Sequence, residues 1–220
     1  MPPGSSLDLG PGIAHECGER WNALVLDRPR PVLSSAPVGG GDLLARRVVN
    51  LCVAGPGCQA ACADPAATFA GLAAEQGWDG PLVGLMTGVP AAHLGTAARG
   101  DWAVLATAGT GNAHRAGEPA PPPEGAGTIN IVAVTGQGLS AAARAEALAL
   151  TAEAKAALLA DRGVRAASGG LASGTGTDAV AVVAGPGGDT PFTGYHTASG
   201  QALAAAVREA VAASLAQGGG

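Results

Sequence analysis

Runs of four to eight apolar residues are spread along the chain and predict β-strands. They occupy residues 23–26, 32–35, 82–87, 102–107, 129–134 and 178–184. The last two runs are apolar on both faces, which is typical of strands covered on both sides of a sheet. Residues 28–31, Arg-Pro-Arg-Pro, predict a turn between the first two strands, and residues 46–54 fit either a strand or a helix.

The first predicted helix follows Asp64 and Pro65. Aspartate can cap the free amides at a helix start, and proline fits the first helical position. Phe69 and Leu72 then point inward, and the helix is expected to end near Gly77.

Two longer helices are predicted in the second half of the chain. Ser140 caps one that runs to about residue 162, where Gly163 is a natural stop. The other spans residues 199–215, and its apolar residues recur every four positions and form one buried stripe. These residues are Leu203, Val207, Val211 and Leu215.

Six or seven strands with three helices, the hairpin-like strands early and the long helices late, predict an α+β protein. The expected architecture is a single-domain layered sandwich in which a mixed β-sheet packs with long helices. Residues 1–20 are expected to be a flexible lead-in, and residues 21–217 the domain. Residues 90–100 are expected to be a short helix or loop, and residues 116–126, with four prolines, an exposed loop.

Composition excludes several classes of function. Hydrophobic residues make up 47% of the 220 residues and charged residues 13%, which argues against disorder. The net charge is −5 without any block of Lys or Arg, so neither nucleic acid nor an anionic membrane is an expected partner. No apolar run reaches the roughly 18 residues of a spanning helix, and the first 18 residues lack a signal-peptide pattern. A cytoplasmic location is the expectation.

The four cysteines are Cys17, Cys52, Cys58 and Cys62. Their spacing lacks the paired pattern of zinc or iron–sulfur sites, so reduced thiols are the favoured interpretation. A Cys58–Cys62 disulfide and a metal site remain alternatives. We expect no metal and no cofactor, and the pattern does not decide the oligomeric state.

Polar, glycine-rich segments interrupt the apolar pattern, mostly at the ends of predicted strands. A rigid sheet presents such loops to ligands, and glycine lets backbone amides approach a substrate closely. Their side chains are hydroxyls and amides with few charges, which suits a ligand rich in amide groups. The candidate substrate-binding residues are Ser34, Ser35, Asn50, Thr87, Thr107, Asn112, Thr128, Asn130 and Thr175.

Five residues are candidates for catalysis. His196 is the leading general base, because histidine exchanges protons near neutral pH, and Asp178, at the start of a buried strand, could orient it. The alternatives are a helix-entry histidine and a turn aspartate. Glu153 and Lys155 lie two positions apart on a helix, so they point to different sides and one of them could reach inward. The alternative is a pair of solvated surface charges. Water is the preferred nucleophile, followed by Thr177 or Ser35.

Taken in order, these segments resemble the adenosylcobinamide amidohydrolase family over about residues 20–216. The resemblance rests on residues 34–37, Asn50, 86–87, 107–112, 127–131, 153–155, 175–178 and 196–197. It implies hydrolysis of the amide that joins a corrin side chain to aminopropanol, in adenosylcobinamide or a pseudo-cobamide. It also implies a small-molecule corrinoid substrate, adenosylcobyric acid as product and a role in cobalamin salvage.

The resulting hypothesis is amide hydrolysis in a cleft formed by the uncharged loops. Backbone amides of residues 174–177, or the Asn130 side chain, would meet the tetrahedral oxyanion. Two alternatives belong to other classes: a corrinoid-binding protein without catalysis, and a self-processing N-terminal nucleophile amidohydrolase.

Overall fold

The computed structural model describes residues 9–55, 57–119 and 127–218, and it confirms the predicted α+β class. Residues 1–8 of the predicted lead-in and residues 120–126 of the predicted loop lie outside the described part. Residues 13–17 of the lead-in are not loose, because they form strand β1 (Ile13–Cys17) against β2. None of the helices in the described ranges combines the length and hydropathy needed to cross a membrane.

Eight strands form one mixed sheet in the order β4-β3-β2-β10-β8-β6-β5, with β1 added beside β2. The β3–β4 and β8–β10 pairs are parallel and the others antiparallel. The other strands of the sheet are β2 (Trp21–Ser34), β3 (Gly41–Cys52), β4 (Leu82–Thr87), β5 (Gly95–Arg99), β6 (Trp102–Ala108), β8 (Ile129–Thr135) and β10 (Ala179–Val183). A separate pair joins β7 (Ala113–His114) to β9 (Gly174–Thr175).

Strand β2 is longer than predicted and serves both halves of the sheet. The predicted turn at residues 28–31 is wrong, because the strand continues through it with an irregularity in its pairing to β3 between Val25 and Arg30. The first half of β2 pairs with β1 and β3, whereas its second half pairs with β3 and β10. The irregularity accommodates prolines, which cannot donate to a regular ladder.

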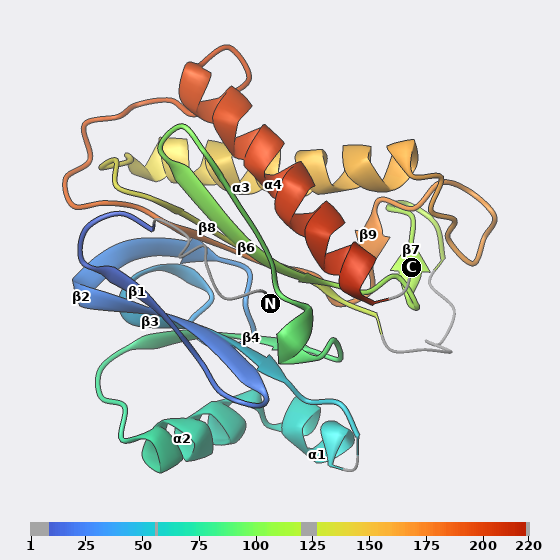
Figure 1. Ribbon diagram of the computed structural model, residues 1–220, viewed down its shortest axis with the longest axis horizontal. Helices are drawn as coiled ribbons and strands as arrows, with labels where there is room; N and C mark the ends of the chain where they lie inside the picture. Colours follow the sequence, from blue (N-terminus) through green and yellow to red (C-terminus); the bar gives the residue numbers. More distant parts are fainter. Residues whose placement is uncertain (1–8, 56, 120–126, 219–220) are drawn as a thin grey trace.

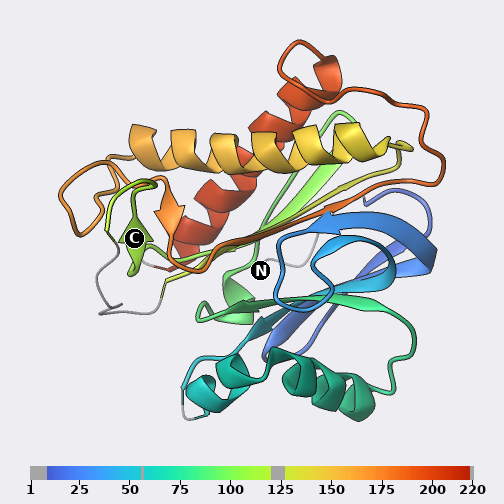
Figure 2. The same ribbon diagram turned by 180° about the vertical axis from the view of Figure 1, so that it is seen from behind.

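The molecule has four layers (Figures 1 and 2). Helices α3 (Ala141–Asp161) and α4 (Ala198–Gln217) cover one face of β6, β8 and β10. The β2–β3–β4 half of the sheet lies over the opposite face, and a second apolar cluster fills the space between the two halves. Helices α1 (Cys58–Ala63) and α2 (Pro65–Gln76) lie beyond β3 and β4.

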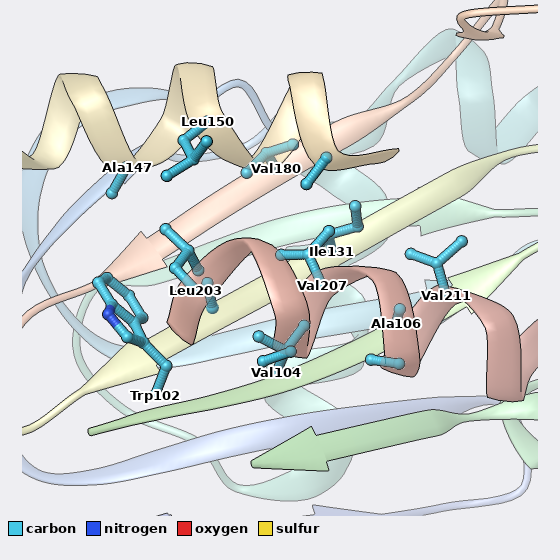
Figure 3. Close-up of a cluster of buried hydrophobic side chains, with 14 of the residues drawn as sticks. Trp102, Val104, Ala106, Ile131, Ala147, Leu150, Val180, Leu203, Val207 and Val211 are labelled. Carbon is cyan, nitrogen blue, oxygen red and sulfur yellow. The ribbon is translucent and has the colours of Figure 1, made fainter. Parts of the chain in front are cut away.

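Alternation along the central strands explains why they are apolar on both faces. In β6, Trp102 and Val104 enter the cluster under α3 and α4, whereas Ala103 and Leu105 enter the cluster between the halves. Figure 3 shows the first cluster, in which the predicted stripe of α4 packs down onto β6 and β8. Strand β8 is buried along its whole length, as predicted.

The predicted helix boundaries agree closely with the structure. The Asp64 side chain accepts a hydrogen bond from Ala67 N, and α2 ends at Gly77 in the left-handed conformation (φ 65°). Ser140 caps α3 by accepting from Ala143 N. Residues 46–54 lie mainly in a strand, and the prediction missed β5, which follows a short 3₁₀ helix (Ala91–His93).

Two glycine substitutions test this packing, and we expect them to change the free energy of unfolding in opposite directions. A Cβ on Gly95 would lie 2.0 Å from the carbonyl oxygen of Ala210, so Gly95→Ala must push α4 off β5. We expect it to lower the free energy of unfolding by about 1–3 kcal/mol or more. Gly71 lies exposed in α2, where an added Cβ meets nothing within 4 Å. Gly71→Ala should raise stability by about 0.5–1 kcal/mol.

Urea unfolding of both variants beside the wild type measures the two effects. A Gly95→Ala protein as stable as the wild type would contradict the close approach of α4 to β5.

Candidate active site

The predicted polar segments meet at one rim of the sheet because of strand direction. Strands β8 and β10 are parallel, so Asn130 and Ala179 at their amino ends are paired. Strands β6 and β2 run antiparallel to them and bring Thr107 and Ser34 to the same rim. The rim therefore gathers residues that are far apart in sequence.

The carboxylate of Asp178 is the centre of this rim. Its Oδ1 accepts hydrogen bonds from Ile129 N (2.9 Å) and from the Thr175 hydroxyl. Its Oδ2 accepts from Lys155 Nζ (2.5 Å) and Thr175 N (2.9 Å). A carboxylate has about four lone-pair sites, and all are used here. Asp178 thus positions its neighbours and has no lone pair left to act as a base.

Lys155 is the inward-facing member of the predicted Glu153 and Lys155 pair. Its side chain is 9% exposed and that of Asp178 is 11% exposed, so this is a buried ion pair. A Cβ on Gly174 would lie 2.4 Å from Asp178 Oδ2 and 2.7 Å from Lys155 Nζ. Any larger residue at position 174 would have to displace the pair.

Glu153 points away from the rim and is exposed. Its carboxylate accepts a hydrogen bond from the Tyr195 hydroxyl, which raises the pKa of Tyr195 above its ordinary value. Glu153 therefore contacts the loop that precedes α4, and the structure does not bring it to the Asp178 cluster.

A buried amide network joins the two halves of the sheet beneath the rim. Asn50 Nδ2 donates to the Thr107 hydroxyl (2.8 Å), and Asn130 Nδ2 donates to Asn50 Oδ1 and to the Met86 carbonyl (both 2.8 Å). Asn130 Oδ1 accepts from Ala179 N (3.2 Å). Because Asn130 is 1% exposed and both its donor hydrogens are used, its predicted contact with an oxyanion is not available. The network locks the layers together.

Two more candidates have structural hydrogen bonds. The buried Ser34 hydroxyl donates to the Val180 carbonyl (2.9 Å) and accepts from Ala36 N (3.0 Å). The buried Thr87 hydroxyl accepts from Val89 N (3.0 Å). Ser35 differs, because it is exposed at the rim and its hydroxyl accepts only from Val180 N (3.0 Å).

The turn after β9 offers the groups that remain available to a ligand. The backbone amides of Gly176 and Thr177 donate to no other described residue. Thr177 is exposed, and its hydroxyl lies 2.8 Å from that of Thr128. Asn112 Nδ2 lies only 3.0 Å from the position that a Cβ on Gly176 would occupy. These amides and hydroxyls form an uncharged surface directly above Asp178.

His196 lies at the other end of the sheet from Asp178. Ser199, three residues later, accepts a hydrogen bond from Trp102 Nε1 (2.9 Å) at the start of β6. Trp102 pairs with Thr135 at the end of β8, whereas Asp178 lies at the start of β8. Both views show the loop before α4 far from β9 (Figures 1 and 2). The predicted orientation of His196 by Asp178 is therefore corrected: β10 and the loop after it carry the chain along the sheet before His196.

The structure instead brings His114 to the rim, a residue that sequence reasoning did not select. His114 pairs with Gly174 in the short β7–β9 ladder. Neither two-residue strand has a periodic pattern, and 60 positions separate the partners, so no local signal marks the contact.

The described residues contain no cluster of three or more His, Cys, Asp or Glu side chains placed to hold a metal ion. The Cys58 and Cys62 sulfurs are 4.0 Å apart, too far for a disulfide bond, and both cysteines belong to α1, away from the rim.

The fold and site define a class of protein: a layered α+β domain whose uncharged, glycine-rich loops converge over a buried Lys–Asp pair. The family model described as adenosylcobinamide amidohydrolase matches residues 11–220, so the chain belongs to that family, as its motifs predict.

Similar proteins include an adenosylcobinamide amidohydrolase of Halobacterium salinarum, 41% identical over 148 residues, with 62% of this chain and 59% of the relative covered. An uncharacterized protein of Methanocaldococcus jannaschii is 36% identical over 96 residues, covering 43% of this chain and 38% of the relative. The chain thus matches less than two thirds of either relative's length. The crystal structure of a protein from Pyrococcus horikoshii aligns with 96% of this chain at 12% sequence identity and a TM-score of 0.45. The alignment includes 81% of the Pyrococcus chain.

The buried ion pair can be tested against an exposed one. Lys155→Met leaves the Asp178 charge buried without its partner, and we expect a loss of about 3–5 kcal/mol in the free energy of unfolding. The matched control is Arg99→Met, which removes an exposed pair with Glu209 whose side chains are 56% and 45% exposed. Urea unfolding should show a loss below about 1 kcal/mol for this control. Equal effects in the two variants would contradict the anchoring role of Lys155.

The position of His196 gives a second prediction. His196→Ala removes an exposed side chain at the far end of the sheet, so the amide hydrolysis proposed below should stay within about twofold of the wild-type rate. Steady-state assays of both proteins measure this. A fall of two or more orders of magnitude would restore His196 as a catalytic candidate.

Proposed function

We propose that this chain hydrolyses the amide between the corrin side chain and aminopropanol of adenosylcobinamide, releasing adenosylcobyric acid. Family membership supports the reaction class, and the name of the halobacterial relative supports the substrate. Corrinoid salvage, including the remodelling of pseudo-cobamides, is the role that fits this reaction.

The available amides of Gly176 and Thr177 are the observation that carries the proposal. Hydrolysis of an amide passes through a tetrahedral intermediate whose oxygen gains negative charge, and preorganised N–H groups stabilise it. The Asp178 carboxylate fixes both ends of this turn, by its own place in the chain and by its bonds to Thr175. The two amides are therefore held in place before substrate binds.

Water is the proposed nucleophile. Its oxygen bonds to the amide carbon, the carbonyl oxygen takes up charge at the Gly176 and Thr177 amides, and the C–N bond breaks as the nitrogen gains a proton. Asn112 and Thr177 lie at this turn and Ser35 is exposed at the same rim, and these three are proposed to bind the amide-bearing side chains of the corrin. Thr128 is buried and contributes by holding the Thr177 hydroxyl. Thr175 contributes by holding Asp178.

The test is incubation of the full chain with adenosylcobinamide, followed by mass spectrometry of the products. We expect equimolar adenosylcobyric acid and aminopropanol, with turnover unchanged by a chelator. Thr177→Val is the informative variant: if water is the nucleophile, loss of one hydroxyl hydrogen bond lowers turnover by about tenfold at most.

Three other outcomes would overturn parts of the proposal. Tight corrinoid binding without product would indicate a binding protein. Complete loss of turnover in Thr177→Val would make the threonine hydroxyl the nucleophile. Two fragments in the intact mass spectrum would indicate a self-processing amidohydrolase.

A further inference from the structure

We infer that His114 is the residue that transfers the proton during amide hydrolysis, an inference that rests on the proposed function. It would take a proton from the attacking water and return it to the departing nitrogen. The argument depends on where the backbone holds this histidine, what its ring faces and which other groups are free.

The backbone of His114 is tied to the loop that carries the site. His114 pairs with Gly174 and Ala113 with Thr175 in the β7–β9 ladder. The His114 carbonyl accepts from Ser173 N (2.9 Å), and the Ser173 hydroxyl accepts from Ala116 N (2.8 Å). The histidine therefore has a fixed position relative to the turn that Asp178 anchors.

The ring of His114 lies over Gly176. A Cβ on Gly176 would be 3.3 Å from Cδ2 and 3.5 Å from Nε2 of the ring, and 3.0 Å from Asn112 Nδ2. The φ of Gly176 is outside the left-handed region, so its backbone does not require glycine. What glycine provides here is space, which places the imidazole beside the Gly176 and Thr177 amides.

His114 is the histidine among four that contacts this turn, and all four belong to the described residues. His15 Nε2 lies 3.1 Å from Asn22 Oδ1, and His93 is in the 3₁₀ helix after β4. His196 is at the far end of the sheet. The ring nitrogens of His114 have no hydrogen-bond partner in the described ranges, and the side chain is half-buried. Its proton-accepting nitrogen is thus open to a ligand.

The other ionisable groups near the rim are already engaged. Asp178 accepts four hydrogen bonds, one of them from Lys155. Beyond this pair, the charged groups on the segments packed against β7 are Arg115 and Glu118, which pair with each other at 3.5 Å, and Arg165, which donates to the Gly169 carbonyl (2.8 Å). Among the described residues of the rim, the imidazole is the group with capacity to accept and return a proton.

The proton balance is complete without another reactant. As the water oxygen bonds to the amide carbon, His114 takes one water proton and becomes imidazolium while the carbonyl oxygen becomes an oxyanion. The oxyanion then re-forms the carbonyl, the C–N bond breaks, and the imidazolium proton goes to the aminopropanol nitrogen. The products are a carboxylic acid and an amine, and His114 is neutral again.

The test compares His114→Gln with His15→Gln, which is the same change at a histidine outside the site. General acid–base catalysis contributes about 10²–10⁴-fold, so His114→Gln should lose that much in kcat with little change in KM. His15→Gln should keep wild-type turnover. The wild-type rate should fall on the acid side of its pH profile, because a base that already carries a proton cannot take one from water. This fall should be absent from His114→Gln.

Two further measurements separate catalysis from folding. Imidazole added to His114→Ala should restore part of the turnover, which a structural role would not allow. Gly176→Ala keeps the imidazole but puts a methyl 3.0 Å from Asn112 Nδ2 and 3.3 Å from the His114 ring, so these side chains must move by a few tenths of an ångström. It should lower kcat while retaining the wild-type melting temperature within a few degrees.

The outcomes distinguish the two proposals. If the wild type forms no adenosylcobyric acid, the proposed function fails. If the wild type is active and His114→Gln is as fast with the same pH profile, the assignment of His114 fails and the function stands. If His114→Gln does not fold, the other two measurements decide. The assignment of His114 is then overturned by an unchanged kcat in Gly176→Ala, or by the failure of imidazole to restore turnover in His114→Ala.

Discussion

The Asp178 carboxylate accepts hydrogen bonds from three parts of the chain: the Lys155 side chain on α3, the first amide of β8, and Thr175 at the end of β9. Burying a carboxylate is costly unless its charge is paired and its lone pairs are filled, and here both conditions hold. The same hydrogen bonds fix the position of the 174–177 turn relative to the ends of β8 and β10. The position of the candidate site therefore follows from satisfying one buried charge.

The pairing of β2 with strands in both halves of the sheet is a second constraint on how the layers are arranged. Because one strand pairs with β1 at one end and β10 at the other, the β3–β4 half of the sheet lies over β6 and β8. This brings Asn50 opposite Thr107 and Asn130, and a complete amide network forms in an otherwise apolar interior. Fully satisfied networks of this kind specify a single arrangement of layers. They support the rim from below and are not available to a ligand.

The positions of His196 and His114 show that the neighbours of a residue in the fold cannot be read from its neighbours in the sequence. His196 follows a predicted strand and precedes a helix, which made it attractive, but the loop before α4 spans the sheet and removes it from the rim. His114 lies beside a proline-rich stretch with no regular pattern, yet a two-residue ladder fixes it beside Gly174. Contact across 60 residues is a property of the folded chain, because it depends on β8 and α3 lying between the two segments.

The sequence by itself determined the α+β class, the caps at Asp64 and Ser140, and the central strands, because local periodicity and capping chemistry decide these features. It also indicated that one of Glu153 and Lys155 could reach inward, and it predicted that uncharged glycine-rich loops form the site, but it did not decide which of the two charges is buried. Only the tertiary structure decided that residues 28–31 continue a strand, that Asn130 is locked in the interior, and that His114, not His196, lies beside Gly174 and Gly176. Such outcomes depend on strand pairing and buried hydrogen bonds between distant segments, for which no local pattern exists.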